Sequence, residues 1–231
     1  MLYLVIFLVS FLLGSVPWGL VVSKVGYQLD LRKYGSGNIG ATNALRTLGT
    51  AGGVLVFALD FLKGWLSGLA SLLLVAAFTL PEGAAGPFVW QSLFSFIAPM
   101  ENAITSGVAL FGCVLGHIFS PWLKFKGGKG VACAGGALFV LFGWGLGLVE
   151  LLVFVLVVAK SRYVSLGSLS AAAACAVIGV ILFWNVPAAM MSCVVCAMLV
   201  FWAHRSNIKK LRDARSARSA RRPGRFSRIN S

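Results

Sequence analysis

The sequence predicts an all-α integral membrane protein with seven transmembrane helices, the N-terminus outside the membrane and the C-terminus in the cytoplasm. Composition, apolar runs and the placement of charge lead to this prediction. Of the 231 residues, 59% are hydrophobic and 11% are charged, and the mean hydropathy is +0.91. Soluble domains carry about 25% charged residues. The composition therefore excludes an ordinary soluble protein.

Apolar runs account for most of the predicted helices. A spanning helix needs about 20 mostly apolar residues. Runs of this kind lie at residues 1–23, within 51–80, at 103–122 and, as a pair broken at 184–187, within 163–203. The first run has no basic residue before it, which favours a retained span over a signal peptide. Residues 81–102 are expected to form an exposed loop with an amphipathic stretch.

Residues 130–159 are long for one crossing and short for two, and the placement of charge decides between them. Lys and Arg near the ends of spans stay cytoplasmic. Two crossings place all basic loops and the basic tail on one side, with Glu82, Glu101 and Glu150 on the other. Glycines at 143, 145 and 147 allow a bend in the middle. We therefore predict two crossings here.

This topology gives one membrane domain over 1–208 and a basic, disordered tail over 209–231. The net charge is +14, and the last 27 residues hold ten basic residues and one acidic residue. We expect the tail to associate weakly with anionic lipids, with an RNA-binding arm as the alternative. The five cysteines all lie in apolar runs and are expected to pack as free thiols.

The first loop, residues 35–46, combines glycines with hydrogen-bond donors. Glycines let backbone N–H groups approach an anion, and a helix that begins near Asn43 would direct its positive end there. The loop also offers the polar side chains of Ser36, Asn38, Thr42 and Arg46. Gly35, Gly37 and Gly40 match a dinucleotide-binding pattern, but no strand precedes them. A phosphate-binding loop is favoured, and a flexible polar loop is the alternative.

The second loop, residues 124–130, leads directly into an apolar helix. Gly130 stands where a Walker A loop needs Ser or Thr, so that motif is excluded. Glycine N–H groups, three lysines and a helix N-terminus still predict an anion site. The alternative, that the lysines only hold the loop in the cytoplasm, explains Lys124 and Lys126. It leaves the glycines around Lys129 unexplained.

Three further pairs are spaced for one helical face. Ser165 with Ser168, and His204 with Asn207, are each three residues apart. Helix packing and a structural histidine are the respective alternatives. Asp60 and Lys63 lie inside a span, where ionisable residues mark a buried or functional site. We expect this last pair to orient the first loop.

Together these motifs resemble the bacterial acyl-phosphate-dependent glycerol-3-phosphate acyltransferases, the PlsY family. The resemblance covers about residues 1–210, in order, and rests on residues 35–46, 60–64, 116–117, 125–132, 162–166 and 204–207. It implies a seven-span enzyme of the bacterial inner membrane. Such an enzyme transfers an acyl group from acyl phosphate to the 1-hydroxyl of glycerol 3-phosphate, giving lysophosphatidic acid and phosphate in phospholipid synthesis. The 81–102 loop looks longer than is typical of the family, and the tail has no family counterpart.

The resemblance also implies roles for individual residues. The acceptor phosphate would be held by Ser36, Arg46, Lys129, His204 and Asn207. The acyl-phosphate side would be lined by Gly37, Asn38, Gly40, Thr42, Asn43, Gly127 and Gly128, with Ser165 completing the pocket. The partners are these two substrates and membrane lipids, with no nucleic acid.

No metal or cofactor is expected, because no set of ligands for one is visible. No carboxylate accompanies the cytoplasmic motifs, and Trp122 occupies the place of the Asp that would follow His117 in a His–Asp acyltransferase motif. We therefore hypothesise that a substrate phosphate oxygen accepts the hydroxyl proton, with His204 in a binding role. A transporter for a phosphorylated solute is the alternative function. The sequence has no internal repeat, and its polar residues gather at one surface, which disfavours a transporter.

Overall fold

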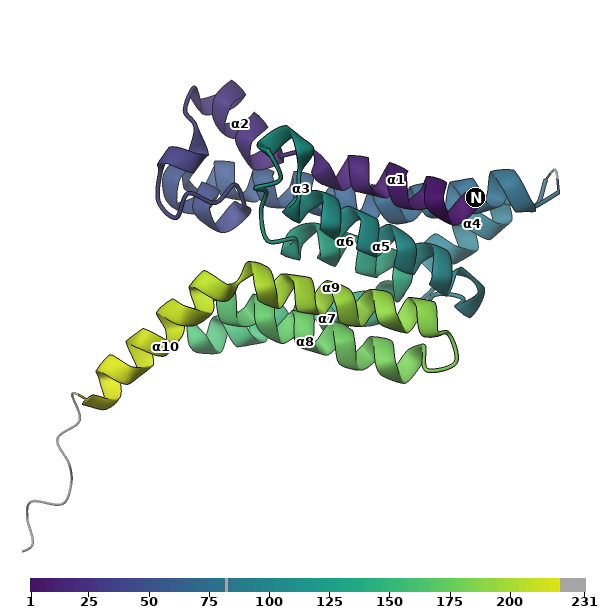
Figure 1. Ribbon diagram of the computed structural model, residues 1–231. Coiled ribbons are helices and arrows are strands. Elements are labelled where there is room, and N and C mark those ends of the chain that lie inside the picture. The colour runs from purple at the N-terminus through teal and green to yellow at the C-terminus, as the bar shows by residue number, and fades with distance from the viewer. Residues whose placement is uncertain (82, 221–231) are drawn as a thin grey trace, which may run out of the picture.

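The computed structural model describes residues 1–81 and 83–220, so Glu82 and the last part of the predicted tail, 221–231, lie outside the described residues. The described residues form helices and loops (Figure 1). The α-helices are α1 (Leu2–Ser15), α2 (Trp18–Tyr27), α3 (Ala41–Thr79), α4 (Ala85–Phe94), α5 (Ala103–Ile118), α6 (Val131–Leu141), α7 (Trp144–Ser161), α8 (Val164–Leu182), α9 (Pro187–Ala203) and α10 (Arg205–Ala220). Short 3-10 turns lie at Leu31–Lys33, Met100–Asn102 and Pro121–Leu123.

The helices form a bundle with two parts. In one part α1 packs on α5 and α3 packs on α6, while in the other α7, α8 and α9 pack in sequence. The contact between α5 and α9 joins the two parts. After α9 the chain bends by 56°, and α10 leaves the bundle (Figure 1). The all-α prediction is therefore confirmed for the described residues.

Five segments are long and apolar enough to cross a membrane: Leu2–Tyr27, Ala41–Thr79, Met100–Leu123, Trp144–Ser161 and Val164–Leu182. A sixth is present if α9 and α10 are taken as one bent span. Large hydrophobic side chains are exposed along their flanks, as lipid-facing surfaces require. Helix α6 has 11 residues, fewer than a straight crossing needs. The count of seven spans and their orientation therefore stay predictions.

The predicted bend within 130–159 is present as the turn between α6 and α7. Gly143 adopts a φ of 82°, and a Cβ there would overlap the backbone of the 95–98 segment. Backbone hydrogen bonds fasten the turn to that segment, from Ala98 N to Phe142 O at 3.1 Å and from Gly145 N to Phe96 O at 2.8 Å. The predicted bend is therefore confirmed, while the two crossings stay a prediction.

Three parts of the chain differ in detail from the expectation. The first predicted span is interrupted at Pro17, where the ring cannot continue the hydrogen-bond ladder between α1 and α2. The amphipathic stretch in 81–102 is the helix α4, which packs on α3 through Val89 and Leu93. Residues 205–220 are helical, although we expected disorder from 209. Lys, Arg and Ala, which predominate there, are strong helix formers.

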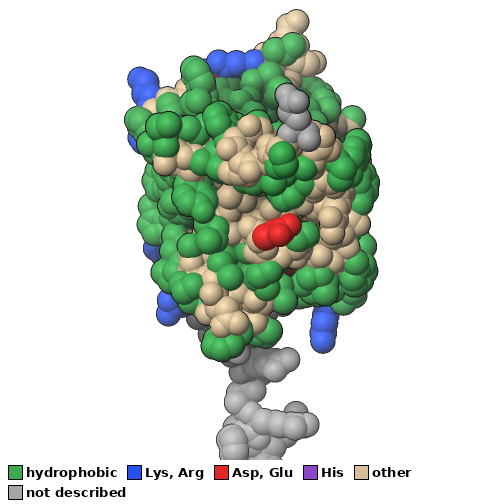
Figure 2. Space-filling view, turned by 90° about the vertical axis from the view of Figure 1, so that its right-hand side faces the viewer, with side chains coloured by type: hydrophobic (Ala, Val, Ile, Leu, Met, Phe, Trp, Pro, Cys, Tyr) green, Lys and Arg blue, Asp and Glu red, His purple; other side chains and the backbone are tan. Residues whose placement is uncertain are grey.

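The two ends of the bundle differ in charge. The basic end carries α2, the 28–40 and 119–130 loops, the α7–α8 turn and the α9–α10 junction (Figure 1). Its exposed cations include Lys24, Arg32, Lys33, Arg46, Lys124, Lys126, Lys160 and Arg162. Figure 2 looks onto the opposite end and shows acidic atoms among hydrophobic side chains, with Lys and Arg only at the margins. The predicted gathering of the basic loops at one end is confirmed.

Glu150 was predicted to lie on the same outer surface as Glu82 and Glu101, and this is only partly correct. Glu101, which was expected on the same side, is exposed at the end opposite the basic end. Glu150 is instead 5% exposed and lies in the second turn of α7, inside the bundle. Its sequence position near the Gly143 turn suggested an outer surface, but the side chain is on the inward face of the helix.

Candidate active site

The first loop is held by one buried amide. The side chain of Asn43 accepts a hydrogen bond from Ser36 N at 2.9 Å. Its Nδ2 donates to the carbonyl oxygens of Leu31, Tyr34 and Asn38, at 3.2, 3.0 and 2.8 Å. Asn43 is 2% exposed, so these loop contacts occupy the amide fully. The structure therefore gives Asn43 a positioning role in the loop and leaves its amide no free group for a ligand.

Helix α3 begins directly after this loop, within two residues of the predicted start at Asn43. Gly40 caps the helix and donates its N–H to Asn38 Oδ1 at 2.8 Å. Asn43 N and Ala44 N both bond to Gly40 O, which leaves Ala41 and Thr42 without an intrahelical acceptor. These N–H groups and the positive end of the helix dipole form a site for an anion.

The second loop folds against the end of α5, which corrects one part of the prediction. The N–H groups of Gly127 and Gly128 donate to Ile118 O and His117 O, both at 3.0 Å. They are therefore not free to bind an anion. A Cβ at Gly127 would overlap the His117 carbonyl, and one at Gly128 would overlap its imidazole. These glycines permit close packing of the loop, and the free N–H groups lie further on, in the first turn of α6.

A buried ionic cluster lies beneath this loop. Lys63 Nζ is 2.9 Å from Asp60 Oδ1, donates to His117 Nδ1 at 2.9 Å and donates to Val16 O at 2.8 Å. Val16 lies at the break between α1 and α2, and its carbonyl oxygen also accepts from Trp18 N at 3.1 Å. The predicted internal pair of Asp60 and Lys63 is therefore present. Its contacts in the described residues lead through His117 to the second loop, and not to the first loop as we expected.

Lys129 joins the second loop to α10. Its Nζ donates to Asn207 Oδ1 at 2.6 Å. Burial, together with the nearby charges of Lys210 and Arg46, lowers the pKa of Lys129 to about 8. Three cations therefore lie close enough to affect one another, a costly arrangement that an anion would relieve. Lys210 was missed by the sequence analysis, although it stands three residues after Asn207 on the same face of α10.

His204 follows the last residue of α9 and is 2% exposed. Its Nδ1 lies 2.8 Å from Val200 O, so Nδ1 carries the proton and donates it to that carbonyl. Burial lowers the pKa of His204 to about 4, although the Val200 contact opposes this shift. The imidazole is therefore neutral at pH 7, and Nε2 is left as a hydrogen-bond acceptor.

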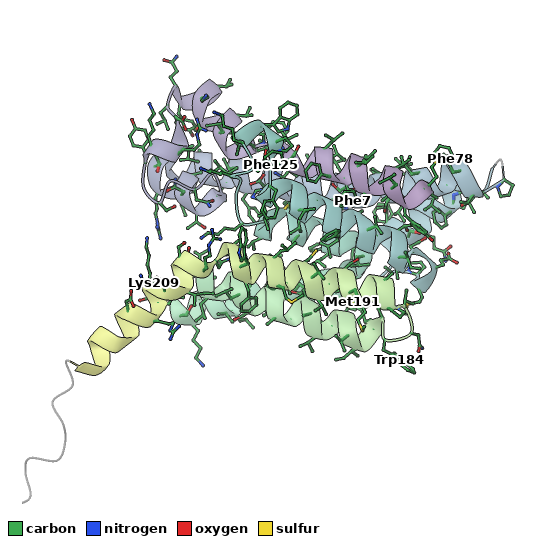
Figure 3. All side chains as sticks on the ribbon, in the orientation of Figure 1. Phe7, Phe78, Phe125, Trp184, Met191 and Lys209 are labelled. Carbon is green, nitrogen blue, oxygen red and sulfur yellow. The ribbon has the colours of Figure 1, made fainter. Side chains whose placement is uncertain are left out.

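A cavity with an empty volume of about 800 Å³ opens at the basic end, and we call it the basic cavity. It is lined by Asn38, Ile118, Phe119, Phe125, Lys126, Gly127, Gly128, Lys129, Trp202, Ala203, Arg205 and Ser206. Of the predicted site residues, Asn38, Gly127, Gly128 and Lys129 line the cavity, together with Arg205 and Ser206 from the fourth motif. Its lining does not include Ser36, Arg46, Thr42, His204 or Asn207. Figure 3 places Phe125 and Lys209 at this end, and Phe78 and Trp184 at the other. Arg205 lies over the Trp202 ring at 4.2 Å, a wall contact that the sequence analysis did not anticipate.

The third motif lies apart from this cavity. Ser165 is in the first turn of α8 and does not line the basic cavity. Ser168 Oγ donates to Val164 O at 3.0 Å within the same helix, which is consistent with a role in helix packing. Among the predicted site residues, Ser36, Gly37 and Arg46 lie in or next to the first loop, and each is exposed.

A second cavity, with an empty volume of about 750 Å³, lies between α3, α5, α6, α7, α8 and α9, and we call it the apolar cavity. Val131 and Ala132 line it, immediately after the loop that lines the basic cavity. Small residues leave this space open on three helices: Ala132, Ala134, Gly135, Gly147, Ala171 and Ala172. The sequence analysis assigned these residues only to spans, because a stripe of small residues also fits close helix packing.

Fold and site together define a helical membrane protein with a cationic cavity at one end and an apolar cavity inside the bundle. This class of protein has features suited to an amphiphilic, phosphate-bearing ligand. A family model described as glycerol-3-phosphate acyltransferase matches residues 4–214. The chain belongs to the glycerol-3-phosphate acyltransferase family, whose reaction is part of phospholipid synthesis.

Individual proteins of this family are similar to the chain over most of its length. A glycerol-3-phosphate acyltransferase of Geobacillus kaustophilus is 36% identical over 207 residues, which cover 89% of this chain and 90% of the relative. One of Thermus thermophilus is 38% identical over 209 residues, with 89% of each chain covered. A crystal structure of PlsY (YgiH), an integral membrane glycerol 3-phosphate acyltransferase in its glycerol 3-phosphate form, is 33% identical. It superposes with a TM-score of 0.72 over 92% of this chain and 93% of that chain.

Replacing Asn43 by Ala is expected to loosen the first loop. The substitution removes the donor for three loop carbonyls and the acceptor for Ser36 N, and each unpaired buried group costs about 1–3 kcal/mol. Amide hydrogen exchange in residues 31–43 should accelerate by at least about tenfold. Asn185→Ala, at the exposed α8–α9 turn, is the matched control and should leave this exchange unchanged. Wild-type exchange in the Asn43→Ala protein would contradict the positioning role.

Proposed function

We propose that this chain transfers an acyl group from acyl phosphate to the 1-hydroxyl of glycerol 3-phosphate, giving lysophosphatidic acid and inorganic phosphate. The reaction would take place at the cytoplasmic face of a bacterial inner membrane that the chain crosses seven times. One observation carries the proposal: at the start of α6 the chain passes directly from the lining of the basic cavity, at Lys129, to the lining of the apolar cavity, at Val131. An acyl donor needs both environments next to each other, one for its phosphate and one for its chain.

The charges of the site fit two phosphorylated substrates. In the proposal the acceptor phosphate binds Lys129 and Arg46, and Lys210 adds charge from α10. Ser36 and Asn207 supply neutral hydrogen bonds. The donor phosphate lies at the start of α3, against Thr42 and Asn38, where the N–H groups of Ala41 and Thr42 have no intrahelical acceptor. Anions bound at helix N-termini and beside Lys and Arg are stabilised by the dipole and by charge-assisted hydrogen bonds.

Other predicted residues then act indirectly. Asn43, Gly37 and Gly40 shape the first loop, and Gly127 and Gly128 let the second loop pack on α5. The buried Lys63 cluster holds His117 in place, and His117 in turn supports the second loop. Ser165 stays a predicted member of the pocket on the strength of the resemblance alone.

The transfer step forms one ester bond and breaks one anhydride bond. The 1-hydroxyl oxygen attacks the carbonyl carbon of the acyl phosphate, the bond from that carbon to the phosphate oxygen breaks, and phosphate leaves with the bonding pair. Because the mixed anhydride is already activated, positioning and neutralisation of the leaving phosphate supply the acceleration. The positive ends of α3 and α6 and the cation on Lys129 would serve that purpose.

The proton of the hydroxyl would go to a phosphate oxygen of the substrates. The described residues place no carboxylate in the basic cavity. His204 has an acceptor at Nε2, but its pKa of about 4 makes it a weaker base than a phosphate dianion, whose pKa is about 6. The hydroxyl proton is therefore transferred to the phosphate oxygen and not to His204. In this scheme His204 Nε2 accepts a hydrogen bond from a hydroxyl of glycerol 3-phosphate and orients it.

The activity itself is tested with purified protein, acyl phosphate and glycerol 3-phosphate. Release of inorganic phosphate is expected only when both substrates are present. Lys129→Ala should reduce kcat/KM for glycerol 3-phosphate about 100-fold or more, because it removes a desolvated phosphate contact. Lys124→Ala is the matched control from the same loop and should keep near-normal activity, since Lys124 is exposed and outside the cavity lining. Acyl transfer from a thioester donor alone would contradict the proposed donor.

The pKa of Lys129 predicts a pH dependence. Because burial lowers that pKa to about 8, the amine is charged below pH 8 and neutral above it. Above pH 7 the substrate phosphate is fully ionised. The value of kcat/KM should therefore fall as pH rises through about 8, and the profile reports the free enzyme. Lys129→Arg should remove this fall, since Arg stays charged. A Lys129→Arg profile that still falls near pH 8 would show that another group titrates.

Replacing His204 by Ala separates binding from base catalysis. If His204 orients the acceptor, KM for glycerol 3-phosphate should rise about tenfold while kcat falls by less than that factor. Loss of a general base would lower kcat by a factor of about 10² to 10⁴. Steady-state kinetics at saturating glycerol 3-phosphate distinguish the two. A kcat loss of that size, with acceptor binding intact by calorimetry, would contradict the substrate-phosphate mechanism.

A further inference from the structure

Glu150 is a buried polar group that the mechanism does not use. It is 5% exposed, and in the described residues neither of its carboxyl oxygens has a hydrogen-bond partner. It lines the apolar cavity, on the α7 face that also carries Gly147, Leu151 and Phe154. An unpartnered buried carboxyl is costly. Since Glu150 bonds to no neighbouring helix, it does not hold the bundle together, and its presence in this wall needs another explanation.

The apolar cavity runs from the basic end toward the middle of the bundle. At one extreme it is lined by Val131, the first residue of α6. Glu150 lies eleven residues before the end of α7, and Cys175 lies eleven residues after the start of α8. At 1.5 Å per residue, both lie about 16 Å from the basic end. Glu150 therefore lies near the deep end of the cavity, and Gly147, about 4.5 Å further from the basic end along α7, also lines it.

The cavity also opens sideways. Phe57 on α3 and Leu151 on α7 both line it, and they are 41% and 40% exposed. Both residues belong to segments that are long and apolar enough to cross a membrane, so this opening faces lipid. A hydrocarbon chain can enter there without crossing water, with its phosphate left at the basic end.

We infer that Glu150 is a specificity-determining residue, which ends the apolar path available to the acyl chain of the donor. This inference rests on the proposed function. Up to the level of Glu150 an added methylene meets an apolar wall. At that level it meets a carboxyl group, to which a hydrocarbon chain makes no hydrogen bond. A longer acyl chain therefore adds no binding free energy. Donors whose chains stop short of Glu150 and donors that reach it are therefore distinguished by one polar side chain.

The test measures kcat/KM for a series of saturated acyl phosphates of increasing length, with the purified full-length protein. For wild type we expect a rise of about fourfold per added methylene and then a level region. Glu150→Leu, which keeps the approximate size and removes the polar group, should extend the rise by at least two methylenes. The ratio of kcat/KM for a donor two methylenes past the wild-type level point to kcat/KM for the shortest donor should increase about 16-fold.

Two control variants isolate the polar group. Glu150→Gln keeps an unpaired polar side chain and should level off at the wild-type length. Leu152→Met lies on the exposed side of α7 and should also leave the ratio unchanged. Because the readout is a ratio within each protein, a general loss of stability does not alter it.

Two outcomes overturn the inference in distinguishable ways. If wild type is active and Glu150→Leu has the wild-type ratio, Glu150 does not limit the chain, and only this inference fails. If wild type releases no phosphate with any donor, the proposed function fails, and this inference falls with it.

Discussion

The site depends on the close packing of α3 on α6. Each helix begins directly after a glycine-bearing loop at the basic end. Helix α3 is kinked at Gly49, where φ is 80° and ψ is −174°, so residues 41–48 form a separate short helix before the long segment that packs on α6. Close contact between them is possible because Gly64 and Gly136 lie where a Cβ would meet the backbone of the other helix. The positive ends of the 41–48 segment and of α6 each favour a nearby anion. The basic side chains add to a field that the backbone already provides.

The buried lysine explains how the second loop and the break between α1 and α2 are held in position. Lys63 reaches the break between α1 and α2, and through His117 it supports the turn of the second loop. A charged group this deep is tolerated because Asp60, a carbonyl and an imidazole surround it. Removing either Asp60 or Lys63 would leave the other as an uncompensated buried charge. The cluster therefore couples the position of the glycine loop to the packing of three helices.

Much of the arrangement could be predicted from sequence, and the rest depended on three-dimensional contacts. The helix start near Asn43, the bend at Gly143 and the common end of the basic loops follow from glycine chemistry and charge. The roles of Gly127 and Gly128 could not be predicted in this way. Composition does not distinguish an N–H group that is bonded to a carbonyl from one that is free to bind an anion. Nor could spacing reveal the apolar cavity, whose lining comes from six helices.

The neutral state of His204 and the cationic state of Lys129 follow from one environment. Burial disfavours the charged form of both groups, yet Lys129 starts from a far higher pKa and keeps its charge at pH 7, while His204 loses it. The same desolvation thus leaves a cation for phosphate and an unprotonated imidazole for a hydroxyl. A more solvated imidazole, with a pKa of about 6.5, would be partly protonated at pH 7 and less available as an acceptor. Partial burial at the membrane boundary therefore assigns different chemistry to two basic residues.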